Sequence, residues 1–116
     1  MNTTLEVHKL LTDDGVTVQV AWIPPRARDL PVLLWTHGVG SSFTLSRLWT
    51  VCQHLASQGW GVAFINNRGH DWVALNPGDR RWIGAAFERF EDCVLDFQAA
   101  LRWLRDRGCR RIVIGG

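Results

Sequence analysis

Serine, histidine and aspartate, the three side chains of a nucleophilic hydrolase, gather in two polar segments and one helix-like segment. A serine hydroxyl becomes a nucleophile when a histidine takes its proton and an acid orients that histidine. The candidates of these types are Ser41, Ser42, His37, His54, His70 and Asp71. However, the Gly-x-Ser-x-Gly segment that presents such a serine on a sharp turn occurs nowhere in the chain. We therefore expect no catalytic nucleophile, acid or base among these 116 residues.

Two of the histidines have simpler expected roles. His54 falls one turn before the end of a predicted helix, where a surface position is typical. His37 directly follows an apolar run and is expected to hold the loop after it through a hydrogen bond. Neither position predicts an active base.

The segment 37–42 is rich in glycine and lies between a predicted strand and a predicted helix. Gly38 and Gly40 suit a loop whose backbone must come close to a ligand. One alternative is the phosphate-binding turn of a dinucleotide-binding fold. Against it, Phe43 stands where the third glycine belongs, and Asn66-Asn67 end the next strand instead of a ribose-binding acid. The sequence therefore favours a use of this loop that involves no nucleotide.

A second polar loop follows the next apolar run. Arg68 and Asp71 can brace it through charge-assisted hydrogen bonds, which is the role we expect. A substrate contact by Arg68, His70 or Asp71 is the alternative.

Apolar patterning predicts five strands. Residues 5–11 and 16–22 alternate with period two around Asp13-Asp14-Gly15, a strong signal for a hairpin. The nearly unbroken apolar runs at 32–36 and 61–65 indicate strands buried in a sheet, and residues 111–114 are predicted to form a last strand.

Two helices are predicted between these runs. The first has an apolar stripe and ends at Ser57-Gln58-Gly59; the second spans about 90–107 and ends at Gly108. The first stripe consists of Leu45, Leu48, Trp49, Cys52 and Leu55; the second consists of Phe90, Val94, Phe97, Leu101 and Leu104, widened by Cys93 and Ala100. Residues from about 66 to 87 are expected to be irregular.

This order of elements predicts an α/β fold in which residues 1–116 form a single incomplete domain. An N-terminal hairpin precedes strand–helix–strand–helix–strand, so the later strands should be parallel. Ligands bind at the carboxyl ends of parallel strands. The loops at 37–42 and 66–72 and the end at Gly115-Gly116 should therefore meet at one edge of the sheet.

Three segments resemble, in order and spacing, those of the α/β-hydrolase superfamily. The run 35–40 resembles the His-Gly loop after the third strand of these enzymes, and 67–70 resembles their Arg-Gly-His turn after the fourth. The run 112–116 resembles the fifth strand leading into the nucleophile elbow. The resemblance covers nearly the whole chain and implies the N-terminal half of such a fold, truncated before the elbow.

The resemblance also implies an activity. The intact protein would be a cofactor-free serine hydrolase acting on a small ester or amide, and this chain alone would be inactive. The backbone N–H of Val39 would donate to the oxyanion, supported by His37, Gly38 and Gly40, while Gly116 would be the first elbow glycine. A non-catalytic remnant or binding module is the alternative, and a Rossmann-like nucleotide-binding domain is a further one.

Composition argues against several other classes of protein. The net charge is +2 and the thirteen basic residues are scattered, which argues against a nucleic-acid partner. Three cysteines without a CxxC pair predict neither a disulfide framework nor a metal site. Neither a leader nor an apolar run of membrane-spanning length is visible, so we expect a cytoplasmic protein without a membrane partner.

Overall fold

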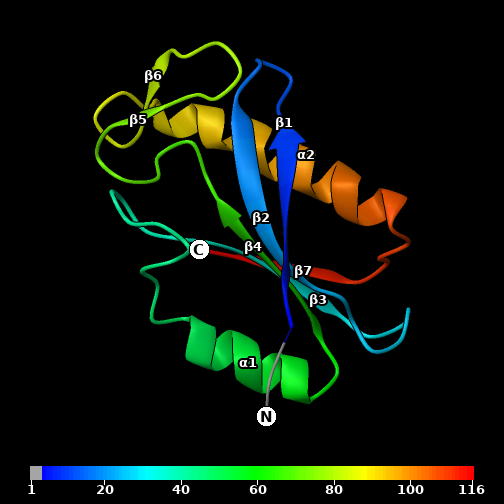
Figure 1. Cartoon of the computed structure of the whole chain (residues 1–116). Helices are drawn as coiled ribbons and strands as arrows, with labels where there is room; N and C mark the ends of the chain where they lie inside the picture. Colours follow the sequence, from blue (N-terminus) through cyan, green and yellow to red (C-terminus); the bar gives the residue numbers. More distant parts are fainter. Residues whose placement is uncertain (1–3) are drawn as a thin grey trace.

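The computed structural model describes residues 4–116 as a mixed sheet with one helix on each face (Figure 1). Met1–Thr3, on which the expected absence of a leader partly rests, lie outside the described residues. The elements are β1 (Glu6–Leu11), β2 (Thr17–Ile23), β3 (Val32–Thr36), α1 (Trp49–Ser57), β4 (Gly61–Asn66), β5 (Ala74–Leu75), β6 (Trp82–Ile83), the 3₁₀ helix η1 (Phe90–Asp92), α2 (Cys93–Asp106) and β7 (Ile112–Gly115).

The predicted N-terminal hairpin is confirmed. β1 and β2 pair antiparallel, with Leu11 opposite Thr17, and the turn is closed around Gly15 at a positive φ of 82°. The Thr12 hydroxyl accepts a hydrogen bond from the Val16 backbone N–H at 2.9 Å. Glycine is favoured at such a turn because residues with a side chain rarely adopt positive φ.

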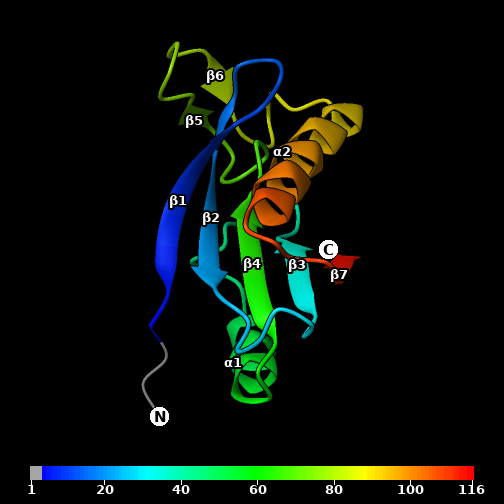
Figure 2. The same cartoon turned by 90° about the vertical axis from the view of Figure 1, so that its right-hand side faces the viewer.

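The later strands are parallel, as the alternation of strands and helices predicts. The sheet order is β1-β2-β4-β3-β7; β3 pairs parallel with both β4 and β7, whereas β2 pairs antiparallel with β4. The carboxyl ends of β3, β4 and β7 therefore share one edge of the sheet (Figure 2). This is the predicted α/β class, and it brings together the three predicted loops.

Each face of the sheet carries its own core because successive strand residues point to opposite sides. Leu34 and Val32 face α2, whereas Leu33 faces α1. Tryptophans fill both cores: Trp22 meets Trp103 edge-on at 5.2 Å on the α2 side, and Trp49 stacks on Phe64 at 5.1 Å on the α1 side. Ring pairs of this kind add to the stabilisation that burial provides.

The first helix begins later than predicted. It starts at Trp49, and Leu45, which the spacing placed on the buried stripe, is 70% exposed in a loop. Tertiary hydrogen bonds hold the preceding segment out of the helix: the Phe43 N–H donates to Asn66 Oδ1 at 3.1 Å, and its carbonyl accepts from the Trp49 indole. Leu48, Trp49, Cys52 and Leu55 do pack into the α1 core as predicted.

The buried stripe of the second helix differs in part from the predicted one. Phe90 lies in η1 and is 82% exposed, and Val94 is 53% exposed, so their predicted burial is wrong. Phe97, Ala100, Leu101 and Leu104 pack against the core as predicted, and the helix also buries Asp96 and Ala99. A charged residue is in this stripe because it has an ion-pair partner in the sheet, described below.

The stretch expected to be irregular contains a small hairpin. β5 and β6 pair antiparallel and lie beside the β1–β2 turn (Figure 1). Asn76, fully buried, accepts a hydrogen bond from the Thr17 N–H at 2.8 Å and donates to the Gly15 carbonyl at 3.0 Å. Each strand has two residues, too short for a periodic signal, so only its contacts with the turn define it.

A candidate active site at the carboxyl ends of the parallel strands

A hollow of about 490 Å³ opens where β3, β4 and β7 end. Its walls come from the loops after β3 and β4, from the start of α2 and from the end of β7. They are mainly apolar, with a few polar groups between them. The lining residues are Thr36, His37, Gly38, Val39, Asn67, Gly69, Glu88, Phe90, Cys93, Phe97, Ile114, Gly115 and Gly116.

His37 is fixed at the exit of β3. Its ring is buried, its Nδ1–H donates to the Gly38 carbonyl at 2.9 Å, and its Nε2 has no hydrogen-bond partner among the described residues. Burial lowers the pKa of His37, so the ring is held neutral. A ring with one nitrogen bonded to the loop and the other sealed from solvent braces the loop and is not placed to take a proton.

The backbone of the same loop faces the hollow. The Val39 side chain is 75% exposed, and its N–H donates no hydrogen bond to any residue in the 4–116 range. Gly40 takes a positive φ of 67°, and the Trp72 ring would lie 2.7 Å from a Cβ placed there. The turn therefore needs glycine at this position, and it leaves the neighbouring amide free to donate to a ligand.

The structure does not assemble a triad from the residues present. In residues 4–116 no serine hydroxyl hydrogen-bonds a histidine ring: Ser42 pairs with Thr44 at 2.8 Å, and Ser57 donates to the His54 backbone carbonyl at 2.6 Å. The His70 ring instead meets Asp71 at 2.7 Å. Neither Ser41 nor Ser42 therefore has a histidine base in hydrogen-bond contact within the described residues.

The loops after β3 and β4 are tied to each other. The Asp71 N–H donates to the Ser41 carbonyl at 2.7 Å, and Asp71 itself has a positive φ of 57°. The Asn67 side chain donates to the Thr36 hydroxyl across the two strand ends. The edge of the hollow is therefore one connected structure and not two independent loops.

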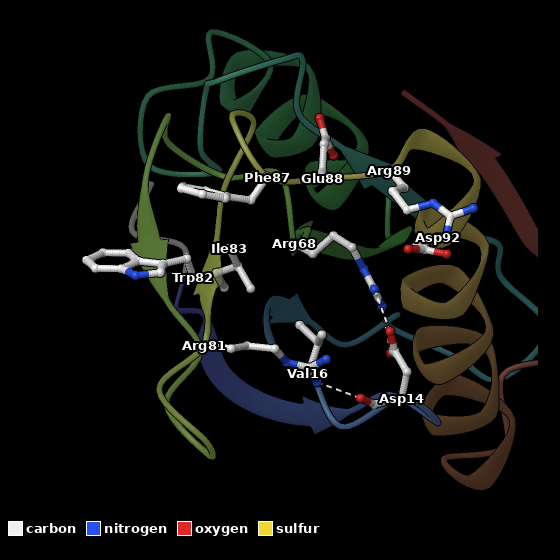
Figure 3. Close-up of a pocket in the computed structure, with 10 residues that line it drawn as sticks. All are labelled: Asp14, Val16, Arg68, Arg81, Trp82, Ile83, Phe87, Glu88, Arg89 and Asp92. Carbon is white, nitrogen blue, oxygen red and sulfur yellow. Dashed lines mark hydrogen bonds and ion pairs between the residues drawn. The ribbon is translucent and has the colours of Figure 1, made fainter.

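Arg68 lies at the centre of an ion cluster beside the hollow, and Figure 3 shows its contact with Asp14 in a close-up of the neighbouring pocket. Its Nε donates to Asp96 Oδ1 at 2.9 Å, and its terminal nitrogens donate to both oxygens of Asp14 at 2.7 and 2.9 Å. The Arg68 backbone N–H donates to the other Asp96 oxygen at 2.8 Å. Arg68 thus binds the β4 exit to α2 and to the β1–β2 turn, while Asp71, the other residue expected to brace this loop, pairs with His70.

The electrostatics follow from this geometry. The Arg68 guanidinium holds the pKa of Asp14 well below its ordinary value of 3.8. Burial would lower the pKa of Arg68, but hydrogen bonds to Asp14 and Asp96 outweigh it and raise that pKa. Burial raises the pKa of Asp96, which is fully enclosed, and the Arg68 contacts oppose that effect. Two carboxylates therefore share one cation.

Glu88 is a third carboxylate beside this cluster. In Figure 3 its carboxylate points away from the Arg68 guanidinium. One of its oxygens would lie 2.2 Å from a Cβ placed on Gly69, so the lack of a side chain at Gly69 makes room for it. Burial raises the pKa of Glu88.

Other kinds of site find no support in the described part of the chain. No group of three or more His, Cys, Asp or Glu side chains there could hold a metal ion. The three cysteines are free, and burial raises the pKa of Cys52 to about 11, which keeps its thiol protonated. No helix within residues 4–116 has the length and apolar character to cross a membrane.

The loop geometry also differs from a phosphate-binding turn. Such a turn leads from its glycines directly into a helix N-terminus. Here α1 begins at Trp49, well beyond Gly40, and an antiparallel strand, β2, lies beside β4. The dinucleotide-binding alternative is therefore not supported.

Sequence reasoning missed Asp14, Asp96 and Glu88. Asp14 was seen only as a turn residue, and Asp96 was hidden because a charge on an amphipathic helix is usually solvated. The signal that could have found Asp96 is its place on the helix, four residues before Ala100 and eight before Leu104, on the same face as two core residues.

Similarity to known proteins is visible in structure and not in sequence. No protein-family model and no curated protein sequence matches the chain. Its structure superposes on the esterase Pf2001 of Pyrococcus furiosus with a TM-score of 0.72 and 21% identity, covering 97% of this chain and 41% of that one. It superposes on the α/β-hydrolase GrgF of Penicillium sp. sh18 with a TM-score of 0.72 and 13% identity, covering 96% and 36%.

A third structure agrees. A cold-adapted esterase from an Arctic intertidal metagenomic library gives a TM-score of 0.65 at 18% identity, covering 97% of this chain and 53% of that one. The chain thus spans about 36 to 53% of the length of these proteins. Identities this low show the fold alone. The chain has the fold of part of an α/β-hydrolase.

Proposed function

We propose that this chain is the N-terminal part of a serine hydrolase that cleaves a small ester or amide, and that residues 4–116 supply one wall of its active site without the nucleophile. The observation that supports this proposal most directly is the free N–H of Val39 at the rim of the apolar hollow. An amide donor held rigidly at the carboxyl ends of parallel strands is suited to an oxyanion that develops during acyl transfer.

In this proposal each residue has a defined part. Val39 donates one of two hydrogen bonds to the oxyanion, and His37, Gly38 and Gly40 set the direction of that N–H. Gly116 is the first elbow glycine, so the nucleophile stands two positions beyond it. The Asp14–Arg68–Asp96 cluster positions the loop after β4, and the substrate lies against Phe97 and Ile114.

The test uses the reading frame expressed to its natural end and assayed with p-nitrophenyl acetate. Val39→Pro removes the N–H, whereas Val39→Ala keeps it and serves as the control. Loss of one oxyanion donor is expected to lower kcat by about 10²- to 10³-fold. The proline variant should lose this much activity while its melting temperature stays close to that of the alanine variant.

Two results would count against the proposal. One is equal activity of the proline and alanine variants, which would remove Val39 from the oxyanion hole. The other is an extended protein that folds but cleaves no activated ester, which would favour the non-catalytic alternative, a binding module. The 116-residue chain is expected to show no turnover in the same assay.

A further inference from the structure

Glu88 is the one carboxylate among the residues that line the hollow, and the proposed reaction does not use it. Within residues 4–116 its carboxylate makes no hydrogen bond and no ion pair, although the side chain is only partly exposed. Its nearest sequence neighbour of opposite charge, Arg89, is engaged by Glu91 at 2.8 Å. The Glu88 oxygens are not sealed from solvent, so the carboxylate is open to a ligand from the hollow.

The charges around Glu88 are not balanced. Asp14 and Asp96 already occupy the guanidinium of Arg68, the cation beside it. Asp14 and Asp96 take up the donors of this guanidinium, and the Glu88 carboxylate points away from it. A carboxylate that no cation contacts within residues 4–116 attracts a further cation and repels anions.

The surroundings define what kind of cation fits. A metal ion needs several ligands, and no group of three or more His, Cys, Asp or Glu in the described residues could supply them. The wall next to Glu88 is apolar, formed by Phe90, Phe97 and Ile114. An organic cation with a short apolar chain would satisfy both surfaces, its ammonium donating to Glu88 and its chain packing on the wall.

We propose that the hollow selects a substrate carrying a protonated amine, and that Glu88 is the specificity-determining residue that binds it. This inference rests on the proposed function for the ester or amide part of the substrate. The position of the carboxylate depends on Gly69, because a methyl group there would displace Glu88.

The first test measures binding to the 116-residue chain itself and needs no nucleophile. n-Butylammonium and n-butyrate are titrated separately into the ¹⁵N-labelled chain, and the backbone amides of Gly69 and Ile114 are followed by NMR. Butylammonium is expected to shift both amides saturably, with an affinity about tenfold higher than that of butyrate. Comparable affinity for the two probes, or no saturable shift with butylammonium, overturns the inference without any variant.

Variants then assign the effect to Glu88. Glu88→Gln keeps the shape of the side chain and should weaken butylammonium binding about tenfold. Glu91→Gln removes an exposed carboxylate three residues away and should leave binding unchanged. Gly69→Ala should weaken binding as well, with little loss of stability because only the flexible end of Glu88 has to move. Equal binding by Glu88→Gln and wild type rules out this role for Glu88.

A second test separates this inference from the proposed function. In the extended protein, butylammonium is expected to inhibit hydrolysis of p-nitrophenyl acetate competitively, and Glu88→Gln to raise the inhibition constant about tenfold. Hydrolysis that butylammonium does not inhibit keeps the hydrolase proposal and removes the amine site. Absence of hydrolysis removes the hydrolase proposal, and the NMR titration then decides on Glu88 alone.

Discussion

Asp14 shows how one turn residue contributes to stability at a distance. It lies in the β1–β2 turn, yet its carboxylate accepts two hydrogen bonds from Arg68, 54 positions later in the chain. A carboxyl whose pKa is lowered in the folded state stabilises the fold above its ordinary pKa. That contribution is lost as the pH falls through the range below about 4.

We therefore expect Asp14→Asn to reduce the free energy of unfolding by about 1 kcal/mol at pH 7, since the pair is partly exposed. The difference from wild type should shrink as the pH is lowered below about 4. Urea unfolding at several pH values measures it. Asp13→Asn is the control, because Asp13 forms only an exposed pair with Arg102. A deficit of Asp14→Asn that stays constant down to pH 2 would contradict this linkage.

Two glycines of the loop after β3 should respond differently to alanine. Gly40 has a φ of 67°, which costs an L-residue about 1–2 kcal/mol. Gly38 has no heavy atom within 4 Å of a built Cβ and no positive φ. Gly40→Ala is thus expected to lower the unfolding free energy by about 1–2 kcal/mol and Gly38→Ala to change it little. Chemical denaturation of both variants checks this, and equal losses would argue against the loop conformation.

At the scale of elements, α2 combines a core stripe with an ion-pair residue. Asp96 shares a face with Ala100 and Leu104, and all three are inaccessible to solvent. Breaking such a buried pair is costly because the remaining charge stays enclosed. The helix therefore fixes the loop after β4 as well as covering the sheet.

The difference in burial between Leu104 and Phe90 leads to a prediction about stability. Leu104→Ala leaves a cavity in the core and should cost about 2–5 kcal/mol of unfolding free energy. Phe90→Ala, at a position 82% exposed, should change it by less than about 0.5 kcal/mol. Denaturant titration of the two variants measures both values. A loss of several kcal/mol in Phe90→Ala would support the burial of Phe90 that the spacing of apolar residues predicts.

At the scale of the whole molecule, β7 is an edge strand. It pairs with β3 on one side, and no other strand of residues 4–116 lies beyond it. Val113 and Ile114 on this edge are 48% and 53% exposed. Unpaired backbone groups next to apolar side chains favour pairing with another chain.

The isolated 116-residue chain is accordingly expected to self-associate as its concentration rises. Val113→Lys should suppress this, since a lysine on an edge strand opposes edge-to-edge pairing. Val51→Lys makes the same change at a similarly exposed position on α1 and should not suppress it. Sedimentation velocity over a concentration series distinguishes the variants. A wild-type chain that stays monomeric at every concentration would contradict the prediction.

The sequence by itself determined the order of the main elements and the position of the loops between them. Apolar runs, period-two alternation and the Asp-Gly turn are local signals, and the strands formed where these signals stood. The resemblance of three ordered segments to those of α/β-hydrolases predicted the architecture. The loops at 37–42 and 66–72 meet at one edge because parallel strands place their carboxyl ends together.

Only the tertiary structure decided which side chains face one another across that edge. The partners of Arg68 come from a turn and a helix far from it in sequence, and no local pattern records such a pairing. Long-range hydrogen bonds also delayed α1 to Trp49. The burial of Asp96 depends on its pairing with Arg68, whereas Glu88 contacts no cation within residues 4–116. The spacing of apolar residues encodes neither outcome.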